Sequence, residues 1–146
     1  MKKLNVLLVR FLVIPIVFCL VIFELSASHQ DDEEKYNKQG CKLALEILIP
    51  VANQTNNGLL QNKIGELYHF KEAIQDFDKA KEWYLKAVKN GNGEAANHLG
   101  RLYLNGEGVT KDYSAALDWY RKGMELGDPY AKENYISLKG TVNTSP

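Results

Sequence analysis

The chain has 146 residues, of which 45% are hydrophobic and 25% charged, and its 18 Lys and Arg residues balance its 18 Asp and Glu residues. This length and composition are typical of one ordinary globular domain. Without a basic excess, the chain lacks the clustered Lys and Arg that bind a phosphate backbone, which argues against nucleic acid as a partner. Its two Cys residues are too few for a disulfide-dense scaffold.

Residues 1–28 have the pattern of a secretory signal peptide. Two lysines stand near the N-terminus, a long apolar run follows, and polarity returns at Ser26. The uninterrupted apolar core from Phe11 to Phe23 holds 13 residues, whereas a helix that crosses the hydrocarbon layer needs about 20. Residues 26–28 are small enough for a signal peptidase. We therefore expect cleavage near Ser28 and an exported protein, either periplasmic or secreted.

The alternative is an uncleaved membrane anchor. Leu4 to Phe23 spans 20 residues if Arg10 is tolerated, and the two lysines would hold that end in the cytoplasm. The protein would then sit in the inner membrane and face outward, and only in this case would the membrane be a partner. Removal of residues 1–28 leaves 15 basic and 17 acidic side chains. The exported part keeps Cys41, which we expect to be a buried apolar residue.

The sequence after the signal segment repeats itself. The segment around Trp83 and Tyr84 reappears 36 positions later around Trp119 and Tyr120. Within each copy, apolar residues recur at helical spacing and therefore lie on one face of a helix. Two such helices joined by a turn cannot hide their apolar faces alone, so successive units must stack. The sequence therefore predicts an all-α chain of stacked helical hairpins.

The helix ends carry matching signals in successive units. First helices are predicted to begin after the N-caps Asn57, Asn92 and Asp128, and second helices after Asp76 and Asp112. The residue before each of the first three caps suits the left-handed end of the preceding helix. The small Ala and Gly residues at matched positions predict a close approach between helices. The caps thus mark where each hairpin starts and turns.

These signals divide the mature chain into five segments. They are N-terminal capping helices at 31–56, a degenerate repeat at 57–91, a repeat at 92–127, a C-terminal capping helix at 128–138 and a loose tail at 139–146. Residues 31–38 are expected to form a short first helix. Pro50 should kink or end the helix that contains it, because proline removes a helical hydrogen bond. Gly106 and Gly108 suit positive φ in the turn of the second unit, and the turn of the first unit must differ.

The repeating residues resemble a known family. The pattern Ala95-x3-Leu99-Gly100-x2-Tyr103, followed by Gly106-x-Gly108 and by Trp119-Tyr120, resembles a Sel1-like repeat, a relative of the tetratricopeptide repeat. The resemblance covers 92–127 nearly in full and 57–91 in degraded form. It implies an α-α superhelix, a Sel1-like or TPR-like solenoid of the kind commonly used as a protein-binding scaffold and often exported in bacteria. The paired Cys of the family's cysteine-rich subgroup is absent from this sequence.

The sequence contains no recognisable catalytic constellation. His29, His69 and His98 lack the spacing of a zinc motif such as HExxH, and we expect them on the surface. No serine lies in a nucleophile elbow, and no Gly-rich loop follows a strand. We therefore expect a protein that is not an enzyme and has no metal and no cofactor. Trp83 and Trp119 are expected to pack between helices rather than to form a stacking platform.

By resemblance to the tetratricopeptide relatives, the first helices line a concave wall. The candidate partner-binding residues lie on these helices, off the apolar stripe, and differ between units: Asn62, Glu66, His69, Asn97, Arg101, Leu104, Glu133 and Ser137. Variable polar groups on a constant frame are what a specific partner surface needs. For each single residue, a solvated side chain without a binding role is the alternative. The expected partner is a protein, and its identity is not given by the sequence.

The sequence thus predicts an exported helical-repeat module that binds a partner protein. Three alternatives stay open. The chain could be a periplasmic inhibitor or immunity protein against a toxin or cell-wall enzyme, or a membrane-anchored assembly adaptor. The least favoured alternative is an envelope enzyme acting on peptidoglycan, which would need a convergent acid and base cluster with perturbed pKa values.

Overall fold

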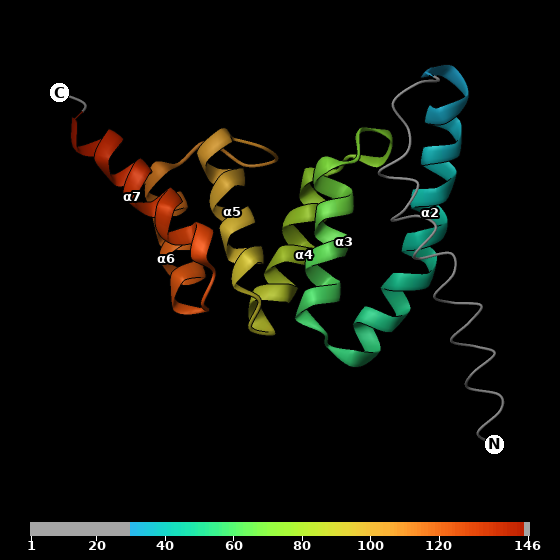
Figure 1. The fold of residues 1–146 in the computed structure, drawn as a ribbon, viewed down its shortest axis with the longest axis horizontal. Coiled ribbons are helices and arrows are strands. Elements are labelled where there is room, and N and C mark those ends of the chain that lie inside the picture. The colour runs from blue at the N-terminus through green and yellow to red at the C-terminus, as the bar shows by residue number, and fades with distance from the viewer. Residues whose placement is uncertain (1–29, 145–146) are drawn as a thin grey trace. The chain divides into compact units, whose positions relative to one another are not determined.

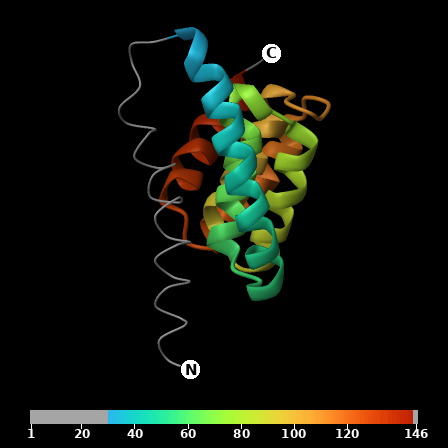
Figure 2. The same cartoon turned by 90° about the vertical axis from the view of Figure 1, so that its right-hand side faces the viewer.

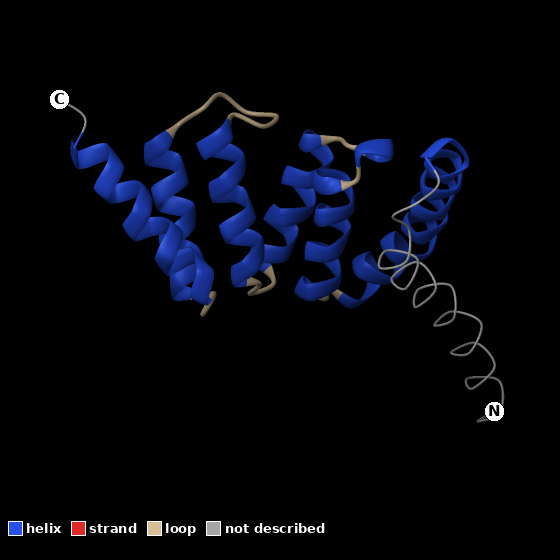
Figure 3. Ribbon diagram, turned by 45° about the horizontal axis from the view of Figure 1, so that its top comes forward, coloured by secondary structure: helices blue, strands red, loops and turns tan. Residues whose placement is uncertain are grey.

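The structure is a computed structural model that describes residues 30–144, with side chains from 37 to 142. The expected signal segment and the last two residues lie outside the described residues, so cleavage and anchoring stay predictions. The described part is helical throughout, and Figure 3 shows its helices joined by loops without a strand between them. No helix within residues 30–144 is long and apolar enough to cross a membrane. The predicted all-α fold is confirmed for this part.

Backbone contacts divide the chain into two units, which meet between Leu48 and Ile49. Helix α2 (Gln30–Thr55) contains the described residues of the first unit, and Cys41 is buried there as expected. Residues 31–38 are part of this helix rather than a separate short one. Of the kink or early end expected at Pro50, the early end is absent, because α2 continues to Thr55. Proline lacks an N–H donor and so costs the helix a hydrogen bond, but it does not stop the helix here. In the last turn, the side-chain hydroxyl of Thr55 donates to the Val51 carbonyl at 2.8 Å.

The second unit consists of paired helices. Its elements are α3 (Gly58–Phe70), a 3-10 turn (Glu72–Ile74), α4 (Phe77–Lys89), α5 (Gly93–Asn105), α6 (Tyr113–Glu125) and α7 (Pro129–Thr144). Each helix packs on the next, as Figures 1 and 2 show from two sides. The first helices α3, α5 and α7 also contact one another in a row, whereas α4 and α6 make no backbone contact with each other. The first helices therefore form an inner wall, and the second helices form an outer one.

The predicted helix starts are confirmed by hydrogen bonds. Asn57, Asn92 and Asp128 accept backbone N–H bonds at the starts of α3, α5 and α7, over distances of 3.1, 2.7 and 2.8 Å. Asp76 and Asp112 cap α4 and α6 in the same way. The residues before the first three caps adopt positive φ, as do both glycines of the α5–α6 loop. Each such cap stabilises a helix by about 1 kcal/mol, and the unequal turns are confirmed by the 3-10 turn that follows α3.

The helix pairs are held by a tyrosine packed on a glycine. Tyr84 of α4 and Tyr120 of α6 are fully buried, and a β-carbon added at Gly65 or Gly100 would overlap their rings. This confirms the predicted close approach of the helices. Trp83 is buried and Trp119 packs against the core cluster of α4 and α5, so the predicted packing role of these residues is also confirmed.

The expected loose tail from residue 139 is wrong up to Thr144, because α7 continues to that residue. A helix that has formed its first turns gains one hydrogen bond for each further residue, so it propagates until a signal stops it. The next proline is Pro146. Leu138 is buried at the point where the expected helix was to end, which anchors the last turns.

Replacing Gly100 by Ala should destabilise the protein by about 1–3 kcal/mol, because the added methyl group must displace the Tyr120 ring or separate the helices. Urea unfolding followed by circular dichroism measures the change. Gly140→Ala is the matched control, since an added β-carbon there meets no atom within 4 Å. The control should be neutral or slightly stabilising, and equal losses in both variants would contradict the packing argument.

Candidate functional site

The eight predicted partner-binding residues all lie on the first helices, but the structure separates them by exposure. Three of them, Asn62, His69 and Asn97, are buried, with 0%, 3% and 7% of their surface exposed. Glu66, Arg101 and Leu104 are half-buried, and Glu133 and Ser137 are exposed. Only the last five therefore present surface to a partner on the inner wall, which we define as the exposed surface of α3, α5 and α7.

The two buried asparagines join neighbouring first helices. Asn62 Nδ2 donates to Glu94 Oε2 on α5 at 2.9 Å and to Glu66 Oε1 at 2.8 Å. Asn97 Oδ1 accepts from Asn134 Nδ2 on α7 at 2.8 Å. Asn62 and Asn97 occupy matching positions 35 residues apart. Because a buried amide must find partners inside the protein, this repeated position holds the inner wall together.

His69 links α3 to the next repeat. Its Nε2 lies 2.8 Å from Glu107 Oε2 in the α5–α6 loop, and its Nδ1 lies 3.1 Å from the Tyr84 hydroxyl. Burial lowers the pKa of His69, although Glu107 beside it acts in the opposite direction. His98 is also buried, so the expectation of surface histidines is wrong for both residues. Their burial depends on contacts between repeats, which the spacing of histidines along the chain does not reveal.

An aromatic residue that the sequence analysis missed lies on the inner wall. Phe70, at the end of α3, is 48% exposed, and the Arg101 guanidinium stands 5.4 Å from the centre of its ring. Its counterpart 35 positions on is Asn105, so Phe70 varies between repeats as the predicted surface residues do. That variation was the available signal. The Phe70 ring also stacks on His69 with 4.0 Å between ring centres, so the Phe70 and Arg101 pair presents a partly exposed aromatic ring and a cation on the inner wall.

Charges of both signs flank this pair on the inner wall. Glu66 forms an ion pair of 2.8 Å with Lys63, whose side chain is 51% exposed. Burial would raise the pKa of Glu66, but His98 and Lys63 beside it together hold that pKa below its ordinary value. Glu66 is therefore ionised at neutral pH and presents a carboxylate to the solvent side of the wall.

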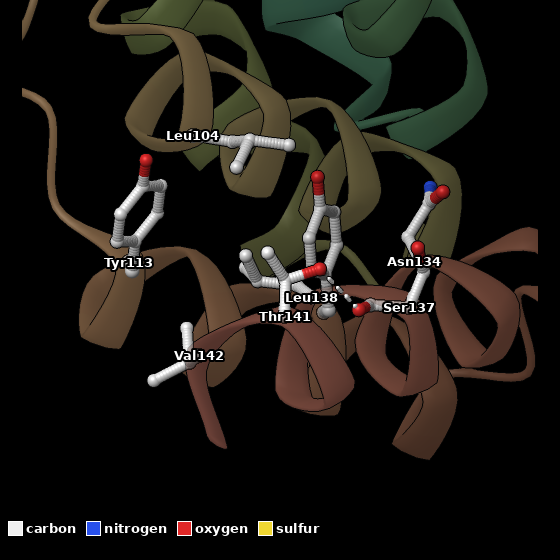
Figure 4. Close-up of a pocket in the computed structure, with 8 residues that line it drawn as sticks. Leu104, Tyr113, Asn134, Ser137, Leu138, Thr141 and Val142 are labelled. Atoms are coloured by element: carbon white, nitrogen blue, oxygen red, sulfur yellow. Dashed lines mark hydrogen bonds between the residues drawn. The ribbon is translucent and has the colours of Figure 1, made fainter. Parts of the chain in front are cut away.

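A pocket opens where α7 meets α5 and α6 (Figure 4). It has a volume of about 380 Å³, and its lining is mostly apolar. The lining residues are Leu104, Tyr113, Tyr120, Asn134, Ser137, Leu138, Thr141 and Val142. Leu104 and Ser137 were predicted from the sequence, and the structure brings them together there. The other six were not predicted as binding residues, and two of them, Thr141 and Val142, lie in the segment that was expected to be a loose tail.

One group of side chains in the described part of the chain has the composition of a metal site. Potential ligand atoms of Glu66, Glu94 and His98 lie within 4.8 Å of one another. Glu94 and His98 are one turn apart on α5, and Glu66 comes from α3. A local motif such as HExxH does not describe this group, because its members come from two repeats and meet only in the folded protein.

The burial of His69 makes stability depend on pH below about 6.5, the ordinary pKa of histidine. As pH falls below that value, the unfolded chain takes up a proton that folded His69 resists, so stability should fall until the lowered folded pKa is reached. The slope is at most about 1.4 kcal/mol per pH unit for one group. The measurement is the thermal midpoint between pH 7.5 and 5, with a chelator present. The midpoint should fall less steeply with pH for His69→Gln, a variant of about the same size, than for the wild type. Equal slopes would show that His69 is not the source of the pH dependence.

Comparison with known proteins identifies the repeats. The family model described as Sel1 repeat matches residues 60–92 and 93–128. A crystal structure of a Sel1 repeat protein from Oxalobacter formigenes is similar to 65% of this chain and 39% of its own, with a TM-score of 0.57 and 28% identity. The matched segments begin one to three residues after the predicted N-caps, in agreement with the hairpins described above.

Two curated relatives are similar over shorter shares of their length. The DAP3-binding cell death enhancer 1 of Rattus norvegicus is 30% identical over 52% of this chain and 15% of its own. The HRD3B component of an ERAD-associated E3 ubiquitin-protein ligase of Arabidopsis thaliana is 33% identical over 60% of this chain and 14% of its own. The chain therefore spans about one seventh of these relatives. The two matched segments, the helical fold and the solved neighbour together show that residues 60–128 form two Sel1 repeats.

Proposed function

We propose that this protein binds a partner protein on its inner wall and performs no chemistry of its own. Sel1-repeat proteins are helical protein–protein interaction modules and are generally non-catalytic scaffolds. The proposed contact residues are Glu66, Phe70, Arg101, Leu104, Glu133 and Ser137. The buried Asn62, His69 and Asn97 then act indirectly, by holding the helices that carry these contacts.

The observation that carries the proposal is the pocket that joins Leu104 to Ser137. Its volume of about 380 Å³ falls in the range of sites that take up a side chain or small ligand. An apolar residue of a partner that fills such a pocket would supply the desolvated anchor on which most interfaces depend. The polar Asn134 and Ser137 at the same pocket would fix its orientation.

Charge supports the same surface. Lys63, Glu66 and Arg101 place alternating signs along α3 and α5, and Glu133 adds a negative charge on α7. Mixed charges around an apolar anchor set the register of a partner more than they raise its affinity. A protein surface with both apolar and charged groups matches this wall better than a uniformly charged polymer does.

The names of the two relatives point to the same class of partner. One relative is named as binding DAP3, and the other is named as a component of a ubiquitin ligase. Both names describe association with other proteins. Because this chain spans about one seventh of each, the likeness supports protein binding in general and no particular partner.

A site-specific photo-crosslinker tests the surface. Placed at Ser137 it should capture the partner, whereas at Asp118 on the outer helix α6 it should not. With the captured partner purified, Ser137→Arg and Arg101→Ala should each weaken binding at least tenfold, a loss of about 1.4 kcal/mol. Asp118→Arg is the matched exposed control and should bind as the wild type does.

Two results would contradict the binding surface. Equal crosslinking from Ser137 and Asp118 would show that capture is unspecific. Unchanged affinity in both Ser137→Arg and Arg101→Ala, with circular dichroism showing intact folding, would remove the inner wall from the contact.

We also propose that the protein is exported, on the basis of the signal-like pattern in residues 1–28. Mass spectrometry of the protein from its native cells should show the loss of about 28 residues. Full-length mass in the membrane fraction would instead favour the membrane-anchored adaptor. Recovery of the full-length protein from the cytoplasm would contradict export in either form.

A further inference from the structure

We propose that Glu66, Glu94 and His98 form a binding site for a divalent transition-metal ion, with Zn²⁺ as the ion that fits best, between the first helices of the two repeats. The site is distinct from the pocket proposed to take up the partner. It rests on the proximity of three ligand groups and on buried polar atoms that have no hydrogen-bond partner.

The ligand groups come from two repeats and meet at one point. Potential ligand atoms of all three side chains lie within 4.8 Å of one another. His98 Nε2 is 3.5 Å from Glu66 Oε1, and the Asn62 amide bridges Glu66 and Glu94 at 2.8 and 2.9 Å. The two carboxylates therefore share one small volume with an imidazole, where a bound cation would relieve their mutual repulsion.

Unsatisfied polar atoms gather at this same point. Among the described residues, the buried side-chain atoms without a hydrogen-bond partner are His98 Nδ1, His98 Nε2 and Asn62 Oδ1. Both residues are nine-tenths or more buried. A buried polar group without a partner costs about 1–3 kcal/mol, so three such atoms in one cluster need an explanation. A metal ion coordinated by His98 and by the Asn62 carbonyl oxygen would satisfy two of them.

Packing holds the imidazole in place. The His98 ring stacks on Tyr84 with 5.0 Å between ring centres, and the ring of Phe70 meets it at 5.6 Å. Glu94 precedes His98 by one helical turn, so both side chains lie on the same side of α5. A ring that is fixed by its neighbours loses little entropy when its nitrogen binds a metal, which favours a preformed site.

Two contacts at the proposed site, those of the Asn62 amide and of Lys63, would have to change for an ion to bind. Asn62 Nδ2 stands between the two carboxylates as a donor, and rotation of this amide by half a turn would present its carbonyl oxygen to an ion. Lys63 now neutralises Glu66 from the solvent side, and its exposed side chain can move away. Glu66 keeps 21% of its side chain exposed, so the site opens onto the inner wall.

The ligand chemistry selects the class of ion. One imidazole nitrogen and carboxylate oxygens are ligands of Zn²⁺ and neighbouring transition ions, whereas Ca²⁺ and Mg²⁺ take oxygen ligands. Zn²⁺ needs ligand distances of about 2.0–2.2 Å, so the ligand atoms, which now lie within 4.8 Å of one another, would have to close around the ion. The ion would bridge α3 and α5 and so connect the two repeats.

Titration of untagged, chelator-treated protein with ZnCl₂ in a calorimeter tests the proposal. We expect one Zn²⁺ bound per chain and a higher thermal midpoint with Zn²⁺ than without. Glu94→Gln and His98→Gln should each weaken binding at least tenfold and abolish the thermal shift. Glu125→Gln, an exposed carboxylate on α6, is the matched control and should bind Zn²⁺ as the wild type does.

Co²⁺ provides a second readout that separates this site from Cys41. Co²⁺ bound here should give visible absorption without a thiolate charge-transfer band. Because His98→Gln also alters core packing, Glu94→Gln is the second ligand variant: it keeps an oxygen that can accept from Asn62 Nδ2, and circular dichroism checks its folding. The proposal is overturned if the wild type shows no saturable Zn²⁺ binding, if binding persists in both ligand variants, or if Co²⁺ gives the thiolate band.

Discussion

The contact between a tyrosine of each second helix and a glycine of its first helix determines the rest of the second unit. Tyr84 on Gly65 and Tyr120 on Gly100 set the distance between paired helices, since any β-carbon at the glycine would overlap the ring. The first helices of successive repeats also contact one another, whereas α4 and α6 make no backbone contact with each other. The first helices therefore form the inner wall.

The side chains of the inner wall both hold the first helices together and supply the exposed surface. Helix α5 is covered by α3, α4, α6 and α7, so most of its residues from Ala95 to Leu102 are buried. Polar groups at the seams between first helices satisfy one another, as Asn97 and Asn134 do. Surface remains mainly where a helix ends or a neighbour is missing, near Phe70 and at the pocket beside α7. The exposed groups of the inner wall thus lie mainly at the edges of a frame whose centre is packed.

The cluster around His98 is the exception among these buried polar groups, because its hydrogen bonds are incomplete. Elsewhere at the seams each buried amide or imidazole of the described residues has a hydrogen-bond partner, whereas His98 Nδ1 has none and His98 Nε2 has only the 3.5 Å approach to Glu66 Oε1. Burial of an unsatisfied imidazole opposes folding, and natural cores rarely keep such a group without a use for it. Its position beside two carboxylates from different repeats means that Zn²⁺ bound at the proposed site would stabilise the stack of hairpins.

Local signals in the sequence determined the helical hairpins. The N-caps, the residues with positive φ and the Trp and Tyr positions depend on contacts within a few residues or on the repeat itself, so they could be found along the chain. The sequence did not reveal that Asn62, His69 and Asn97 are buried, because their partners lie 32, 38 and 37 residues away in the next repeat. It also missed the extension of α7, because helix propagation needs no signal of its own. Tertiary structure decided which polar side chains stabilise the wall and which face solvent, because burial depends on neighbours that only stacking supplies.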